Sequence, residues 1–224
     1  MNAAVVSIIM AIRNSERFIR DALDSIAAQT FGAYEVIVVD GASTDNGFAI
    51  ARTYPNAVCI PQKGEGLAGA WNSGIAAARA PFIAFLDSDD LWMPDTLAAH
   101  LAAFDREPEV EYAFGRTEFF LDYGQSLPRG FRPALLCGSH LVPMCGSSMI
   151  RRATVDCMGP FDERMQIASD IAWLARLRKA HITRALNKVM LKKRLHAGSL
   201  GQSTSWGVFK SELLQIARQR SAEQ

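Results

Sequence analysis

The chain has 224 residues, of which 49% are apolar and 21% charged, and its formal net charge is +1. This length suits one large domain or two small ones, and the near-neutral charge excludes the broad positive field that recruits nucleic acid. The four cysteines show no CxxC spacing, which is typical of buried thiols in a reducing compartment. No apolar stretch approaches the roughly 20 residues of a membrane span, and no signal peptide is predicted, so we expect a cytoplasmic protein.

Strand and helix patterns alternate through the first half of the chain. Helical spacing of apolar residues, with polar caps at Asn14 or Ser15 and at Ser43 or Thr44, predicts helices between short apolar strands. This alternation is typical of a parallel sheet with helices on both faces. The predicted strands are 5–10, 34–39, 57–60 and 81–86, and the predicted helices are 18–27, 44–54, 67–79 and 94–106.

The second half has a different pattern, in which some strands are expected to be antiparallel to the rest. Residues 123–143 are rich in Gly, Pro and Ser and are predicted to form a loop or lid. A basic run at Lys188, Lys192, Lys193 and Arg194 is expected to be a solvated strand face, with contact to a diphosphate or a lipid headgroup as the alternative. The predicted strands are 110–114, 117–121, 147–150 and 189–195, and the predicted helices are 170–180 and 209–218.

Three carboxylates follow the fourth apolar strand, in the segment FIAFLDSDD. Asp87, Asp89 and Asp90 repel one another at this spacing, and a divalent cation with oxygen ligands would relieve the repulsion. The first and second strands also lead into polar residues, at Asn14 and Asp40. The carboxyl ends of parallel strands meet along one edge, where ligands bind. The alternative is that each Asp is a turn or cap residue.

Five segments occur in order along the chain, and a later Asp follows them. They are VSIIMAIRN, EVIVVDGASTD, GLAGAWNSGI, FIAFLDSDDLWMPD and GPFDE. This ordered set resembles family 2 glycosyltransferases. The resemblance covers residues 4–200 and implies an α/β, GT-A fold. This is a Rossmann-like, mostly parallel sheet flanked by helices, with a smaller mixed or antiparallel acceptor-side part. We therefore expect one GT-A domain over 1–205 and a C-terminal helix over 206–220, with a nucleotide-sugar-binding half at 1–106 and an acceptor-side, catalytic-base half at 107–224.

The resemblance also implies a role for individual residues. Asp170 matches the catalytic base, although a helix cap is the plainer interpretation of this residue. Asp87 and Asp89 match the DxD pair that holds Mn²⁺ or Mg²⁺, and His196 matches a histidine near the metal. The implied contacts to the nucleotide sugar are Ala11, Asn14, Asp40, Asn72, Asp87 and Ser88.

These roles imply an inverting, metal-dependent hexosyltransferase. Asp170 would take the proton of an acceptor hydroxyl while the hydroxyl oxygen attacks C1 of the sugar, and the metal would offset charge on the departing diphosphate. The donor is expected to be a nucleotide-diphospho sugar, with UDP favoured as the nucleotide. The expected acceptor is a carbohydrate or a lipid-linked sugar in bacterial surface polysaccharide or glycolipid assembly, which allows peripheral contact with the inner face of the membrane.

Two other functions stay open at this level. A catalytically silent nucleotide-sugar-binding or scaffold module would bind the donor without turnover. A sugar-1-phosphate nucleotidyltransferase would need a Gly-rich, basic phosphate loop after the first strand, and the RNSE sequence at residues 13–16 does not supply one. A dinucleotide oxidoreductase is disfavoured because the chain lacks a GxGxxG loop at that place.

Overall fold

The computed structural model describes residues 3–122, 124–128, 131–196, 208 and 210–216. Most of this chain alternates between strands and helices in the order that the sequence predicts. The helices are α1 (Ile19–Ala27), α2 (Gly47–Ala51), α3 (Gly66–Ala77), α4 (Thr96–Arg106), α5 (Arg152–Met158) and α6 (Ser169–Ala180). The strands are β1 (Val6–Ile12), β2 (Tyr34–Asp40), β3 (Ala57–Pro61), β4 (Phe82–Phe85), β5 (Leu91–Trp92), β6 (Tyr112–Phe120), β7 (Ser139–His140), β8 (Ser148–Arg151) and β9 (Thr183–Arg194).

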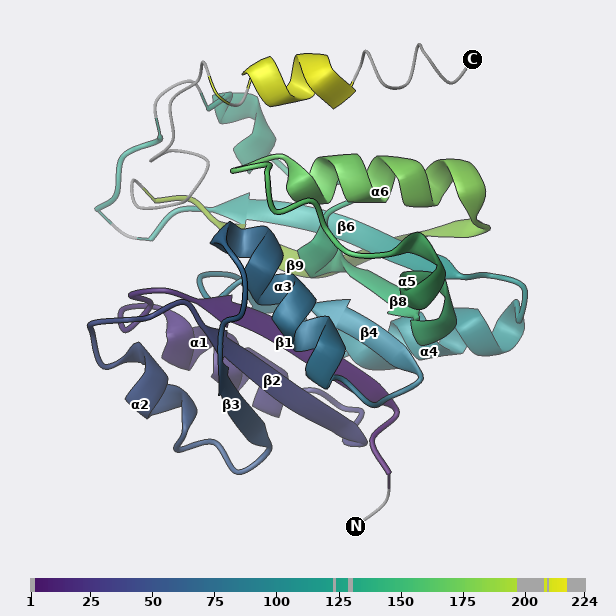
Figure 1. Ribbon diagram of the computed structural model, residues 1–224. Helices are drawn as coiled ribbons and strands as arrows, with labels where there is room; N and C mark the ends of the chain where they lie inside the picture. The colour runs from purple at the N-terminus through teal and green to yellow at the C-terminus, as the bar shows by residue number, and fades with distance from the viewer. Residues whose placement is uncertain (1–2, 123, 129–130, 197–207, 209, 217–224) are drawn as a thin grey trace.

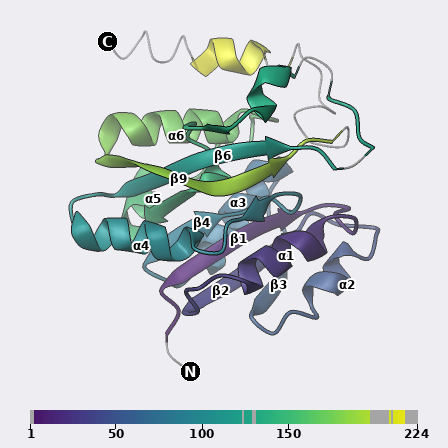
Figure 2. The same ribbon diagram turned by 180° about the vertical axis from the view of Figure 1, so that it is seen from behind.

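Within the described residues the strands form one sheet in the order β3-β2-β1-β4-β8-β6-β9-β5, with β7 paired to β6. The β3-β2-β1-β4 half is parallel throughout. Beyond it, β8 runs antiparallel to both β4 and β6, while β6 and β9 are parallel to each other. Helices α3, α5 and α6 cover the near face in Figure 1, and α1 and α4 cover the opposite face, seen in Figure 2. The predicted α/β fold with a smaller mixed part is confirmed.

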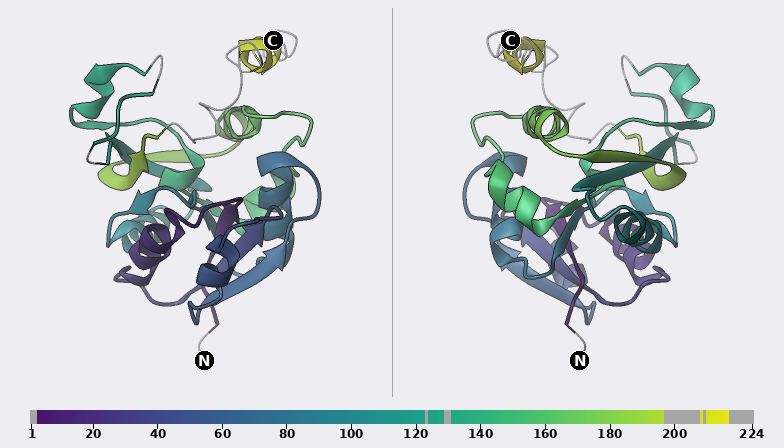
Figure 3. Two further views of the ribbon diagram at one scale, coloured as in Figure 1. Left: turned by 90° about the vertical axis from the view of Figure 1, so that its left-hand side faces the viewer. Right: turned by 90° about the vertical axis from the view of Figure 1, so that its right-hand side faces the viewer.

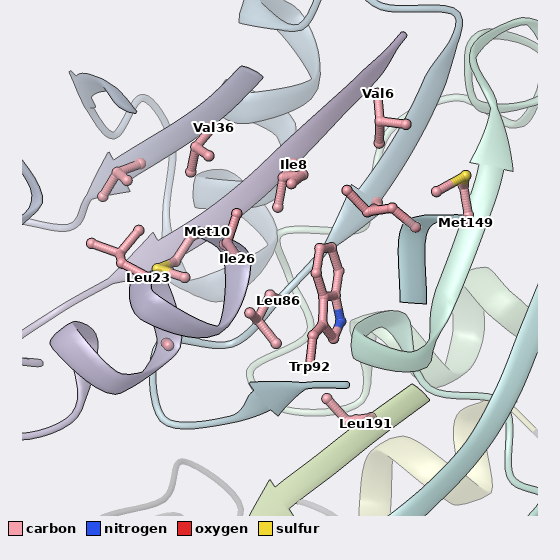
Figure 4. Close-up of a cluster of buried hydrophobic side chains, with 14 of the residues drawn as sticks. Val6, Ile8, Met10, Leu23, Ile26, Val36, Leu86, Trp92, Met149 and Leu191 are labelled. Atoms are coloured by element: carbon pink, nitrogen blue, oxygen red, sulfur yellow. The ribbon is translucent and has the colours of Figure 1, made fainter. Parts of the chain in front are cut away.

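The central strand β1 buries side chains on both faces of the sheet. Ile8 and Met10 point into a cluster shared with α1 and α4, whereas Ile9 joins a separate cluster with α3 and α6. Figure 4 shows the first cluster, to which Ile8, Leu86 and Trp92 all belong. A strand covered on both faces has no solvent-facing positions, which explains why β1 is an almost continuous apolar run instead of an alternating one.

Several predicted boundaries differ from the structure. The two strands predicted at 110–114 and 117–121 are one strand, β6, whose register with β9 shifts on either side of Arg116. At Gly115 a Cβ atom would lie 2.1 Å from Cγ of Met190, so only glycine allows this approach of the strands. Strand β9 begins at Thr183 rather than at 189. Helix α5 was not predicted, and the predicted loop at 123–143 contains a short 3-10 turn (Pro133–Leu136) and β7.

The predicted helix caps were also wrong. Helices α1 and α2 begin at Ile19 and Gly47, and their N-cap residues, Phe18 and Asn46, make no side-chain cap bond; the first amide of α2 donates to the Asp45 side chain instead. The physical reason is that Asn14, Ser43 and Thr44 bond to one another between the loops after β1 and β2.

The C-terminal part of the description is short. Residues 208 and 210–216 are helical, as predicted, while the rest of the predicted helix at 206–220 lies outside the described residues. The division of the chain at residue 106 and the domain boundary at 205 stay predictions. Within the described part of the chain, each helix is too short or too polar to cross a bilayer.

Candidate active site

The carboxyl ends of β1, β2 and β4 lie side by side. Ile12 at the end of β1 is paired with Asp40 at the end of β2, and the Leu86 amide donates to the Ile9 carbonyl at 3.1 Å. The residues that follow these strands therefore share one edge of the sheet, as predicted. Ala11 is half-buried near the end of β1, and Asp40 is partly exposed.

Asn14 joins the first two of these strand ends. Its side-chain oxygen accepts a hydrogen bond from the Thr44 amide at 2.8 Å, and its own amide donates to the Ser43 hydroxyl at 3.0 Å. Asn14 has a φ of 53°, in the left-handed region that Asn tolerates better than most residues. The Asp40 carboxylate accepts a bond from the Ser43 amide at 3.1 Å, which fixes its orientation at the edge.

The third strand end is tied to the first through two serines. The hydroxyl oxygens of Ser15 and Ser88 lie 2.8 Å apart, and either one can donate. Ser88 stands between Asp87 and Asp89, so this bond fixes the acidic loop against the loop after β1.

Asp87, Asp89 and Asp90 form the acidic cluster. One carboxylate oxygen from each lies within 4.8 Å of the others. Asp87 and Asp89 have side chains that are 34% and 23% exposed, whereas Asp90 is fully buried. Burial raises the pKa of Asp90, and the nearby ammonium of Lys193 opposes this effect.

Two basic residues of β9 hold this cluster together. The Lys193 ammonium donates to Asp90 at 2.9 Å and to Asp87 at 3.2 Å. Burial alone would lower the pKa of Lys193, but the carboxylates of Asp90 and Asp87 raise it well above its usual value. The backbone amide of Arg194 donates to the second oxygen of Asp90 at 2.9 Å. The guanidinium of Arg194 donates to the Asp89 carbonyl at 2.9 Å and pairs with the Asp122 carboxylate.

The interpretation of this basic run as a solvated strand face was therefore wrong for Lys193 and Arg194. Arg194 is only 5% exposed, and both side chains are turned toward the acids. The signal in the sequence was the excess of acids at 87–90, because a buried carboxylate requires a cation nearby.

His196 completes the group from the chain just after β9. Its Nε2 lies 2.8 Å from an oxygen of Asp89, and its ring packs against Phe18 with centroids 4.5 Å apart. Both oxygens of Asp90 accept bonds from Lys193 and Arg194, whereas the bonds of Asp87 to Lys193 and of Asp89 to His196 each use one oxygen. Carboxylate oxygens are the ligands that Mn²⁺ and Mg²⁺ prefer, so Asp87 and Asp89 fit the predicted metal, and Nε2 of His196 would bind it in place of its bond to Asp89.

Asp170 lies at the start of α6. Its carboxylate accepts a bond from the Ile171 amide at 2.7 Å. Burial raises the pKa of Asp170 to about 6, with a further contribution from the Asp87 carboxylate. Burial and the carboxylates of Asp170 and Asp87 also raise the pKa of the Cys145 thiol well above its usual value. A carboxyl group with a raised pKa is typical of a general base.

Asn72 on α3 makes contacts that the sequence does not suggest. Its amide nitrogen donates to the Phe161 carbonyl at 3.1 Å and to the Glu163 carboxylate at 2.9 Å, and its oxygen accepts from the Phe161 amide at 2.9 Å. The side chain thus holds the loop between α5 and α6. Contact between Asn72 and a nucleotide sugar stays a prediction.

Comparison with known proteins shows the family of this chain. The family model described as Glycosyl transferase family 2 matches residues 7–158, which is more than half of the chain. A relative from Escherichia coli, named UDP-Glc:alpha-D-GlcNAc-diphosphoundecaprenol beta-1,3-glucosyltransferase WfaP, is 28% identical over 203 residues, covering 88% of this chain and 79% of the relative. Two other curated relatives are 40% and 36% identical, and the matches span only 29% and 34% of their lengths.

Two solved structures share the fold. The S. aureus protein TarS 1-349 in complex with UDP has a TM-score of 0.68 and 23% identity, covering 86% of this chain and 61% of that one. The mannosyltransferase PcManGT from Pyrobaculum calidifontis, in complex with GDP-Man and Mn²⁺, has a TM-score of 0.65 and 19% identity, covering 85% of this chain and 57% of that one. At these identities the comparison establishes the GT-A fold.

Proposed function

Because the chain belongs to glycosyl transferase family 2, we propose that it moves a sugar from a nucleotide-diphospho-sugar donor to an acceptor hydroxyl, with inversion at the anomeric carbon. The observation that carries this proposal is the acidic cluster at the strand ends, where carboxylate oxygens of Asp87, Asp89 and Asp90 lie within 4.8 Å of one another and His196 is bonded to Asp89. A second feature is Asp170 in the first turn of α6, where burial raises the pKa of its carboxyl group to about 6.

The nucleotide-sugar contacts of the proposal lie at the ends of β1, β2 and β4. Asp40 and Asn14 would bind the nucleoside, with Ala11 beside them, and Ser88 would border the diphosphate. Mn²⁺ or Mg²⁺ would be held by Asp87, Asp89 and His196 and would supply positive charge to the departing diphosphate. UDP is the proposed nucleotide because WfaP is named for a UDP-linked donor and TarS was solved with UDP.

Asp170 would act as the general base. At neutral pH a carboxyl group with a pKa of about 6 is mostly ionised and is more basic than an ordinary Asp. It would accept the proton of the acceptor hydroxyl as the new C1–O bond forms. The bond between C1 and the diphosphate oxygen breaks at the same time, and the electron pair leaves with the nucleotide.

The proposed acceptor class comes from the name of WfaP. WfaP is named for transfer to GlcNAc linked to diphosphoundecaprenol. We therefore propose a carbohydrate or lipid-linked acceptor in bacterial surface polysaccharide or glycolipid assembly. The proposed location is the cytoplasm, with contact at the inner face of the membrane where the acceptor is lipid-linked.

The test is a transfer assay with UDP-sugars, Mn²⁺ and a diphosphoundecaprenol-linked GlcNAc acceptor. Wild type should release UDP and form a product of inverted configuration, and Asp170→Asn should be slower by about 10²–10⁴-fold because it lacks the base. Asp156→Asn, an exposed Asp on α5, is the matched control and should keep full activity. Equal rates for Asp170→Asn and wild type, or retention of configuration, would contradict the mechanism. UDP binding without turnover across a wide acceptor panel would instead support a silent binding module.

A further inference from the structure

Glu212 makes an unusual set of contacts from the helical residues 210–216. Its carboxylate accepts hydrogen bonds from three consecutive backbone amides, those of Gln166 at 2.7 Å, Ile167 at 3.1 Å and Ala168 at 2.9 Å. The residue is only 8% exposed. A carboxylate that accepts several amide hydrogen bonds makes strong, charge-assisted contacts. One side chain therefore fixes three successive peptide units.

These three peptide units lead directly into α6. The helix begins at Ser169, and its second residue is Asp170. Apolar contacts reinforce the same junction, because Ile216 forms a buried cluster with Met165 and Ala168. In Figures 1 and 3, residues 210–216 (yellow) lie beyond α6, on the side away from the β1–β4 half of the sheet. The segment thus contacts the residues that lead into α6.

The other end of the same loop is held by α3. The Glu163 carboxylate accepts bonds from the Asn72 side chain at 2.9 Å and from the Glu65 amide at 3.0 Å. With both ends of the 163–168 segment fixed, the direction of the first turn of α6 is set. The Asp170 carboxylate takes its orientation from that turn, through its bond with the Ile171 amide.

We infer that Glu212 is a positioning residue for Asp170, which acts through the backbone of residues 166–168 and touches no substrate. Small displacements of a catalytic group are costly, because proton transfer requires close, aligned contact with the acceptor hydroxyl. The inference rests on the proposed role of Asp170 as the base. It places part of the catalytic apparatus beyond residue 158, where the family match ends.

The first test does not depend on activity. Amide hydrogen exchange is measured by NMR in the full chain for wild type, Glu212→Gln and Glu212→Asp. Glu212→Gln should raise exchange about tenfold or more at residues 166–168 and also at Ile171, since each amide loses a charged acceptor or its alignment. Glu212→Asp should give exchange rates between those of wild type and Glu212→Gln. Leu214→Ala, at a 49% exposed position of the same segment, is the control and should change none of them. Unchanged protection at Ile171 in Glu212→Gln would overturn the inference.

The second test separates positioning from binding. Glu212→Gln should lower kcat for sugar transfer about 10–100-fold, with the affinity for UDP and Mn²⁺ unchanged and with partial recovery in Glu212→Asp. An unchanged kcat, or a loss of UDP affinity by the same factor as kcat, would overturn it. If wild type binds no nucleotide and transfers no sugar, the proposed function fails, and the exchange at Ile171 still decides whether Glu212 orients Asp170.

Discussion

At the scale of single residues, the environment of Asp170 is unfavourable for a carboxylate. Burial holds its pKa at about 6, above the value of about 3.9 in an unfolded chain. The native state therefore binds this proton more tightly than the unfolded state does. Proton binding by Asp170 therefore adds to the free energy of unfolding. This contribution is fully present below pH 4 and is lost as the pH rises through about 6. A charge kept at such a place is typical of a functional residue.

Removing the charge of Asp170 should stabilise the protein at neutral pH. Asp170→Asn keeps the side-chain oxygen that accepts from Ile171 and removes the charge, so it should raise the free energy of unfolding at pH 7 by about 1–3 kcal/mol. The gain should shrink toward zero as the pH approaches 4, where Asp170 of the wild type is protonated. Urea unfolding at both pH values measures the difference. A gain of equal size at both values would show that the charge of Asp170 is not the cause.

Residue identity alone did not show which charges face the site. Lys188, Lys192, Lys193 and Arg194 look equivalent in the sequence. In the structure Lys188 pairs with Asp95 away from the acidic cluster, while Lys193 and Arg194 contact it. The direction of each side chain depends on the register between β9 and its neighbours. Because this register shifts near Gly115, the direction cannot be predicted by counting residues along the strand.

At the scale of elements, Asp90 joins the loop after β4 to the end of β9. Replacing it with alanine would leave the Arg194 amide without its acceptor and Lys193 with only one of its two carboxylates. We expect Asp90→Ala to lower the free energy of unfolding by about 2–4 kcal/mol. Urea unfolding of this variant checks the prediction.

Asp156→Ala provides the matched control for this measurement. Asp156 is 57% exposed and pairs with Arg152 one helical turn away, so its loss should cost less than about 0.5 kcal/mol. If Asp90→Ala proved no more destabilising than this control, the acidic cluster would not hold β4 and β9 together.

The contact between α3 and the sheet gives a third prediction. A Cβ atom on Gly74 would lie 2.3 Å from Cγ2 of Ile9 and 3.3 Å from Cγ2 of Val39, and Ile9 is completely buried. Gly74→Ala should therefore destabilise the protein by about 1–2 kcal/mol, since overpacking outweighs the better helix propensity of alanine. Gly32→Ala is the control, because its Cβ would meet no atom within 4 Å. Thermal or urea unfolding that ranks the two variants equally would contradict the close packing of α3 on β1.

The sequence predicts the first half of the fold well because local and global signals agree there. Strands β1, β2, β3 and β4 are short apolar runs, and helical spacing of apolar residues marks segments between and after them. The second half was less predictable. Helix α5 has seven residues, too few for a distinct period, and most of β9 is polar because much of it is exposed. Strand pairing there depends on partners distant in the chain, which local patterns do not encode.

At the scale of the whole molecule, the parallel strands bring together acids that lie far apart in the sequence. The common edge of Asp40, Asp87 and Asp89 was predictable because each stands at or just after the end of an apolar strand, and parallel topology puts those ends side by side. Asp170 and His196 were assigned from a resemblance alone. The support from Glu212 could not be predicted, because one Glu in a polar terminal segment carries no sequence signal of its distant backbone partners.

We propose that this edge of the sheet binds a nucleotide diphosphate through a divalent cation. The most direct measurement is calorimetric titration of UDP, GDP and dTDP, each with and without Mn²⁺, into wild type and Asp89→Ala. We predict that UDP binds wild type only when Mn²⁺ is present, and that Asp89→Ala loses this binding while remaining folded, because Asp87, Asp89 and His196 are the proposed metal ligands. UDP binding of equal strength without the metal, or undiminished in Asp89→Ala, would contradict the claim.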